Sequence, residues 1–119
     1  MNEMEIFGKD GSHPIPELDV CDIEAKLKSG GAELVVVIAS PMADDLRSRK
    51  RLMRKLENYL GYIRSEPFAA QYGAAPPVSV IVRYHPDISE GILDLLNQCH
   101  GWVEDSGATL VLTPLVLKN

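Results

Sequence analysis

Four residues whose side chains could bind or react with a ligand lie where a predicted strand meets a predicted helix. They are Arg83, Tyr84, His85 and Asp87. Ligand sites of open α/β sheets commonly lie at the carboxyl ends of parallel strands, so this quartet is the best candidate for a small-molecule site. Helix capping and solvation of surface side chains explain the same residues without any ligand. A binder or enzyme with a site near His85 is therefore an alternative hypothesis and not the leading one.

Other reactive residue types occur without the spacing that catalysis or metal binding needs. Cys99 and His100 are neighbours, but adjacent helical residues point about 100° apart and cannot by themselves act as nucleophile and base. Cys99 lies on an apolar helical stripe, where a free cysteine packs as a small hydrophobe. His13, His85 and His100 lack the spacing of a metal site. We therefore predict no catalytic residue and no metal ligand.

Phosphate and cofactor binding are also disfavoured. Ser29-Gly30-Gly31 lies between two predicted strands, whereas a phosphate-binding loop joins a strand to a helix. The turn that does join a strand to a helix, at Ser40 and Pro41, contains no glycine. Asp44 and Asp45 are explained by the favourable position of acids early in a helix, without acid–base catalysis. No cofactor is expected, and a non-enzymatic protein is favoured.

Positive charge is concentrated in one segment. Residues 47–55 hold six of the 12 lysines and arginines and no acid, so this segment carries +6 and the remainder −11 against a formal total of −5. At helical spacing, five of the six fall on one arc: Arg47, Lys50, Arg51, Arg54 and Lys55. This predicted basic face is either solvated or contacts an acidic protein partner or the acidic edge of another copy. Nucleic acid is the least favoured ligand, because the protein as a whole is acidic.

The predicted elements are organised around one long apolar run. Residues 33–39 read as a strand buried on both faces. Ser40 as N-cap and Pro41 at the first helical position predict that a long helix follows and ends near Ile63. The other predicted elements are an edge strand over residues 18–28, a helical turn over 68–72, strands over 78–84 and 109–113, and a helix over 88–103.

Together these elements predict an α/β (α+β) fold. It is a two-layer sandwich whose four-stranded mixed sheet arises in the order strand, strand, helix, strand, helix, strand, with the helices mainly on one face. Residues 1–17 contain glycine and proline breaks and are expected to form an N-terminal arm, more mobile than the single domain of residues 18–119. Apolar residues also occur on the opposite sheet face, so either the arm or a second copy should cover it. A homodimer is the resulting prediction.

Composition limits the class and location of the protein. The chain has 119 residues, of which 45% are hydrophobic and 24% charged, as in an ordinary globular domain. No apolar run approaches the ~20 residues of a membrane-spanning helix, and the first residues lack the basic and apolar regions of a signal peptide. The two cysteines have no redox or zinc-site spacing. A cytoplasmic location without membrane contact is the default expectation.

Two passages resemble a family of small bacterial proteins classed only as a domain of unknown function. Val20-Cys21-Asp22-Ile23 is similar to the Val-x-Asp-Ile first strand of that family. Residues 55–63, Lys-Leu-Glu-Asn-Tyr-Leu-Gly-Tyr-Ile, are similar to its Lys-Leu-x-x-Tyr-Leu-x-aromatic-Ile helix. The likeness covers most of residues 18–112 and rests mainly on core positions. It implies a bacterial α/β protein with no established activity, cofactor or catalytic residue, although the basic run at 47–55 is heavier than the family pattern.

The leading functional hypothesis follows from what the sequence contains and lacks. It has no coherent catalytic constellation, and its sheet is apolar on both sides. We therefore expect a non-enzymatic cytoplasmic protein that acts through protein contacts, with self-association first. A small-molecule site near His85 and nucleic-acid binding by the basic face are the alternatives.

Overall fold

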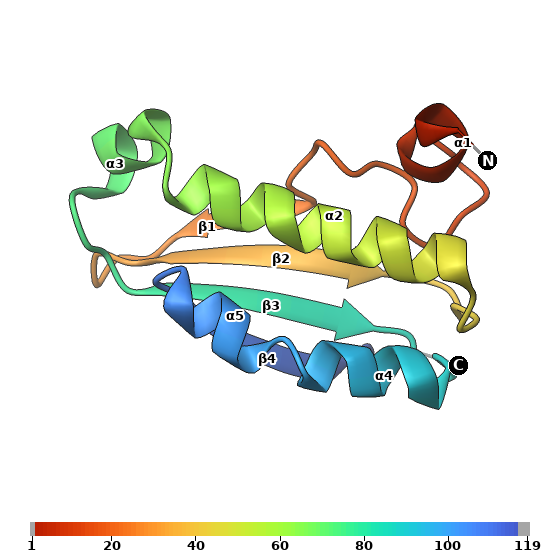
Figure 1. The fold of residues 1–119 in the computed structure, drawn as a ribbon. Coiled ribbons are helices and arrows are strands. Elements are labelled where there is room, and N and C mark those ends of the chain that lie inside the picture. Colours follow the sequence, from red (N-terminus) through yellow and green to blue (C-terminus); the bar gives the residue numbers. More distant parts are fainter. Residues whose placement is uncertain (1, 117–119) are drawn as a thin grey trace.

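The computed structural model describes residues 2–116 and contains one four-stranded mixed sheet (Figure 1). Its strands lie in the order β1-β2-β3-β4. β1 pairs antiparallel with β2, and β2, β3 and β4 are parallel to one another. The bounds are β1 Ile23–Lys26, β2 Ala32–Ile38, β3 Val78–Tyr84 and β4 Thr109–Pro114. The predicted α+β fold and mixed four-stranded sheet are thereby confirmed.

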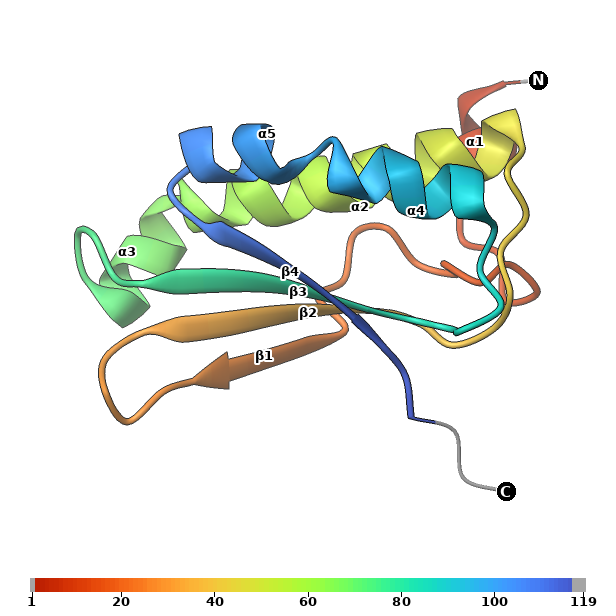
Figure 2. The ribbon, with the colours of Figure 1, turned by 90° about the horizontal axis from the view of Figure 1, so that it is seen from below.

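The helices form a second layer over one face of the sheet. They are α1 Glu3–Phe7, α2 Leu46–Ile63, α3 Glu66–Tyr72, α4 Glu90–Asn97 and α5 His100–Asp105. Figure 2 shows α2, α4 and α5 on the same side of the strands and, in the part of the chain that the structure describes, no helix over the other side. No helix in residues 2–116 has both the length and the apolar character needed to cross a bilayer.

The core fills the space between the two layers. Alternate residues of β2 and β3 point toward the helices, and Leu34, Val36 and Val80 among them are completely buried. From the helical side, Leu56 and Ile92 pack against them and are also completely buried. This packing holds α2 and α4 against one sheet face, so the other sheet face is left without a helical cover.

Helix α2 begins five residues later than predicted. Asp45 is the N-cap, and its carboxylate accepts a hydrogen bond of 2.7 Å from the Ser48 backbone N–H. The predicted start at Pro41 is wrong because residues 40–45 form a connection that inserts Met42, 2% exposed, into the core. Leu46 is the first residue of the helix and is 67% exposed.

Two other predicted elements are shorter than expected. The edge strand covers only Ile23–Lys26, because residues 18–22 bend toward α2 and bury Leu18 in the core. The predicted helix over 88–103 is divided into α4 and α5. Cys99 lies between them, is 5% exposed and belongs to the core, as predicted for a free cysteine on an apolar stripe.

The segment predicted as an N-terminal arm lies on the helical side of the sheet. It runs beside α2 in Figure 1, and it contributes Ile15, which is 1% exposed, to the core. Residues 2–17 therefore leave the middle of the opposite sheet face uncovered, and they approach this face only beside Val37, at the carboxyl end of β2. Of the two predicted covers for that face, the arm is ruled out by its position.

Candidate functional site

The predicted quartet at the end of β3 does not form one site. Arg83 and Tyr84 are consecutive strand residues and therefore point to opposite faces. Tyr84 packs against the core under the helices, whereas Arg83 is exposed beside Val37 and Thr113 on the opposite face. His85 uses its Nδ1 to accept a hydrogen bond of 3.0 Å from the backbone N–H of Asp87. This bond stabilises the turn before α4, but the N-cap of α4 is Ser89, so the interpretation of His85 and Asp87 as helix caps is wrong.

A different histidine lies at the carboxyl end of β2. A cavity of about 530 Å³ there is bordered by His13 and Ala39, among others. The Nε2 atom of His13 is 2.9 Å from the Oγ atom of the buried Ser48, and its Nδ1 accepts from the Ile15 backbone N–H at 2.9 Å. Since Nδ1 is the acceptor, Nε2 carries the proton and donates to Ser48. A serine nucleophile needs the opposite arrangement, so this pair is structural.

The surroundings of His13 predict a pH-dependent stability. Burial, followed by the charges of Arg51 and Arg47, lowers the pKa of His13 from its ordinary 6.5. The folded protein then binds fewer protons at this site than the unfolded chain, so the stabilisation is complete above the unfolded pKa and is lost as the pH falls below it. Thermal unfolding from about pH 7 to about pH 5 should show a larger loss of stability for the wild type than for His13→Asn.

Asparagine is the matched replacement, because its side-chain oxygen can accept the Ile15 hydrogen bond without titrating. His85 and His100 are present in both proteins and cancel in the comparison. Three nearby carboxylates do not titrate in the tested range, because hydrogen bonds lower their pKa values. The side chain of Ser12 donates to Asp10, that of Lys9 to Glu17 and that of Arg49 to Asp44. Parallel pH curves for the two proteins would contradict the assignment.

The predicted basic face is largely internal. Arg51 is completely buried, and its guanidinium donates to the carbonyl oxygens of Ile6 (2.8 Å), Gly8 (2.7 Å), Ile15 (2.6 and 3.1 Å) and Pro16 (3.2 Å). The prediction that Arg51 is exposed is therefore wrong. Its five hydrogen bonds fasten the N-terminal segment onto α2.

Lys55 has the same function one turn further along α2. It is completely buried, and its ammonium donates to the carbonyl oxygens of Glu17 (2.5 Å) and Val20 (2.8 Å) and to the carboxylate of Asp22 (2.8 Å). The prediction of an exposed Lys55 is wrong for the same reason as for Arg51. A buried cation of this kind is tolerated only when its hydrogen-bond donors are satisfied, and these are.

Three neighbouring cations also have partners within the chain. Arg47 forms an ion pair of 2.9 Å with Asp10, Arg49 pairs with Asp44, and the guanidinium of Arg54 lies 3.9 Å from the centre of the Phe7 ring. In the described residues, Lys50 is the member of the basic segment that is exposed and has no ion-pair partner. The surface therefore presents much less positive charge than the sequence suggests.

A signal for this arrangement exists in the sequence. Residues 1–22 contain six acids and one lysine, which gives a charge of −5 opposite the +6 of residues 47–55. The six acids are Glu3, Glu5, Asp10, Glu17, Asp19 and Asp22. Most contacts to Arg51 and Lys55 nevertheless come from backbone carbonyls, which every residue possesses. Charge balance could suggest the pairing of the two segments but not its atomic contacts.

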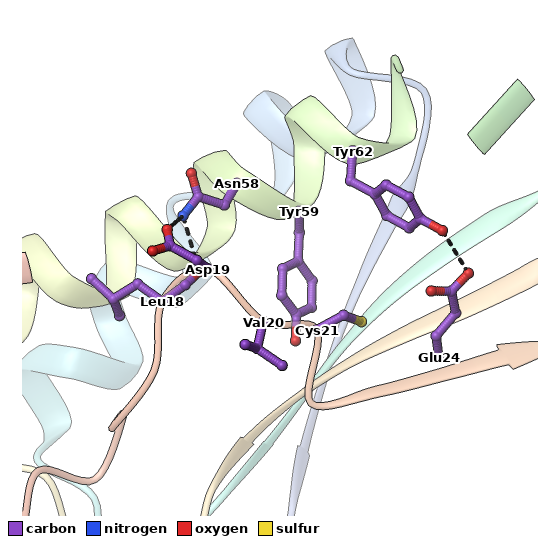
Figure 3. A pocket seen from close by; sticks show the side chains of 8 residues that line it. All are labelled: Leu18, Asp19, Val20, Cys21, Glu24, Asn58, Tyr59 and Tyr62. Carbon is purple, nitrogen blue, oxygen red and sulfur yellow. Dashed lines mark hydrogen bonds between the residues drawn. The ribbon is translucent and has the colours of Figure 1, made fainter. Parts of the chain in front are cut away.

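Sequence reasoning missed a small cavity between α2 and the edge of the sheet, shown in Figure 3. It measures about 360 Å³, and its lining residues are Leu18, Asp19, Val20, Cys21, Glu24, Asn58, Tyr59 and Tyr62. The hydroxyl of Tyr62 donates to the Glu24 carboxylate at 2.8 Å. Burial and this carboxylate raise the pKa of Tyr62 to about 12. Burial also raises the pKa of the Cys21 thiol.

These values describe a cavity without an activated group. The Cys21 sulfur is a thiol and not a thiolate, so it is a weak nucleophile. Glu24 accepts hydrogen bonds from both Tyr62 and Tyr72 (2.8 and 2.5 Å), and Asn58 donates to Asp19 at 3.3 Å. The geometry supports neither covalent nor general-base catalysis here. In the described residues there is also no group of three metal-ligating side chains.

The sheet face turned away from the helices has a different character. We call it the open face. Four apolar residues lie side by side across its strands, and we call them the apolar row: Ile23, Val35, Ile81 and Val111. Val35 and Ile81 are 3% and 9% exposed, whereas the outer Ile23 and Val111 are 46% and 39% exposed. Among buried apolar residues of the described chain, Val35 and Ile81 alone lie outside the core cluster.

Rows that contain polar residues border the apolar row toward both ends of the strands. Toward the amino ends of the parallel strands, the adjacent row is Ala25, Glu33, Ser79 and Thr109. Toward the carboxyl ends, it is Val37, Arg83 and Thr113. The open face thus has an apolar centre, with an acid at one end and a base at the other. An apolar centre with a polar border is the usual composition of a protein contact surface.

The comparisons with known proteins assign no relative. No family model, curated protein or solved structure matches this chain. The resemblance to a family of unknown function therefore stays a prediction, and the function has to be inferred from the surfaces of the chain itself.

Proposed function

We propose that this chain is a non-enzymatic protein that self-associates, with the open face of its sheet as the contact between copies. The apolar row carries the proposal. β2, β3 and β4 are parallel, and parallel sheets are normally covered on both faces. In residues 2–116 the helices cover one face, and the other keeps Ile23 and Val111 substantially exposed. A missing second cover is the simplest explanation.

A second copy is well suited to supply that cover. Two sheets can stack face to face at about 10 Å with interdigitating side chains. Identical chains present the same apolar row, so a two-fold axis matches apolar residues with apolar residues and gives a closed contact. The N-terminal segment does not supply the cover, because Arg51 and Lys55 hold it against α2 on the helical side of the sheet.

The contacts within the chain argue against the two alternatives, a small-molecule site near His85 and binding by the basic segment. The quartet near His85 is split between two faces of the sheet. The cations expected to bind nucleic acid or an acidic partner are mostly buried or paired. Nucleic-acid binding depends on accessible lysine and arginine side chains that contact phosphates. The basic segment offers few of these and supports nucleic-acid binding poorly.

Sedimentation equilibrium of the unmodified chain tests the proposal. The apparent mass should rise from the monomer value of 13.1 kDa toward about twice that value as the concentration increases. A constant monomer mass up to the highest concentration that remains in solution would reject self-association.

A further inference from the structure

We infer that the second copy packs with its strands antiparallel to those of the first, about a two-fold axis that runs across the strands along the apolar row. The inference rests on the proposed self-association and specifies its geometry. Its basis is the placement of two opposite charges, Glu33 on β2 and Arg83 on β3, at opposite ends of the open face.

The register of the sheet fixes the positions of these charges. Val35 is level with Ile81, so Glu33 lies two residues before that level and Arg83 two residues after it. With about 3.3 Å per residue, the two side chains are separated by about 13 Å along the strands of one copy. They are therefore too far apart to pair within a chain.

Both charged side chains are available for a contact between copies. Arg83 is exposed and Glu33 is half-buried. Neither forms an ion pair with another residue of the described chain. The position of Glu33 in a strand interior beside apolar residues is unusual for a carboxylate that has no partner.

A two-fold axis along the apolar row brings the two charges together. Rotation about it places each residue of the row opposite its own equivalent and brings the Glu33 end of one copy over the Arg83 end of the other. Glu33 of one copy then lies over the β2 position that is next to Arg83 of the second copy. The two charged residues are offset by about 4.8 Å in the direction across the strands. Two equivalent Glu33–Arg83 contacts form, one at each end of the row.

The other face-to-face arrangement does not produce this contact. A two-fold axis parallel to the strands, between β2 and β3, puts Glu33 over Ser79 and Arg83 over Val37 of the second copy. The charges of the two copies then remain about 13 Å apart along the strands. Of these two axes, the one along the apolar row pairs the opposite charges, and electrostatic complementarity commonly fixes the register of an interface.

A charge exchange tests this geometry. We expect Glu33→Arg and Arg83→Glu each to raise the dimer dissociation constant about tenfold or more, since each places like charges together twice. The double variant Glu33→Arg/Arg83→Glu should recover to within about threefold of the wild type, because it restores both pairs in reverse. Lys50→Glu, an exposed charge on the helical side, is the matched control and should leave dimerisation unchanged.

The outcomes separate the geometry from the proposed function. Recovery in the double variant supports the antiparallel arrangement. If the wild type dimerises and the single and double variants dimerise equally well, or their losses of dimer affinity add up, this geometry is wrong and self-association is unaffected. A wild type that stays monomeric at all concentrations overturns both. Circular dichroism of each variant at low concentration ensures that a loss of dimer is not a loss of fold.

Discussion

Arg51→Met should lower the free energy of unfolding by about 3 kcal/mol or more. Methionine keeps much of the buried volume but removes every hydrogen-bond donor. The carbonyl oxygens of Ile6, Gly8, Ile15 and Pro16 would then face a buried apolar side chain. Each buried acceptor that is left without a partner costs about 1–3 kcal/mol, reduced where the segment can turn toward water. Urea denaturation followed by circular dichroism measures the difference.

Lys50→Met is the matched control for this prediction. Lys50 lies next to Arg51 on the same helix, but it is exposed and forms no ion pair in the described residues. Its replacement should change the free energy of unfolding by no more than about 0.5 kcal/mol. If Arg51→Met were as mild as Lys50→Met, then Arg51 would not be holding the N-terminal segment, and the assignment of the basic segment as an internal fastening would be wrong.

Replacing both outer residues of the apolar row with lysine should weaken the dimer by about 100-fold or more. In the isolated chain, Ile23 and Val111 are 46% and 39% exposed, so the variant Ile23→Lys/Val111→Lys can fold with both ammonium groups in water. In the dimer, the ammonium groups of both copies would be buried in the apolar contact between the two open faces. The cost of burying unpaired charge then falls on association and not on folding.

Leu46→Lys provides the comparison. Leu46 is 67% exposed at the start of α2, on the helical side of the molecule. A lysine there removes an exposed apolar side chain without touching the open face. The mass measured by sedimentation should remain that of the wild type for Leu46→Lys and approach the monomer value for the double variant. Equal dimerisation of all three proteins would mean that the open face is not the contact.

The three parallel strands and the end of α2 could be predicted from the sequence because their signals are local. Residues 78–84 form a strand with the predicted bounds, and α2 ends at Ile63 as predicted. The start of α2 could not be located in this way, because Ser40 and Asp45 are both suitable caps. The choice depends on Met42, whose side chain lies in the core and whose carbonyl accepts a hydrogen bond from the backbone N–H of Ser89, the N-cap of α4.

The contacts of Arg51 and the apolar row depend on tertiary structure. Helical periodicity assigned Arg51 to a polar arc, but the N-terminal segment folds back over that arc and buries it. Ile23, Val35, Ile81 and Val111 are far apart in the sequence and become neighbours only through strand order and register. The sequence predicted an apolar second sheet face, while the register revealed the alignment of its residues.

Methyl NMR on a mixed dimer tests the central claim most directly. Copies with ¹³C-labelled isoleucine and valine methyl groups are mixed with unlabelled copies, and nuclear Overhauser effects between the two kinds of copy are recorded. We predict cross-peaks from Ile81 and Val35 methyl groups to protons of the open face of the other copy. A dimer whose cross-peaks arise instead from the helical side, or a sample without any such cross-peaks, would contradict the claim that the open face is where two copies meet.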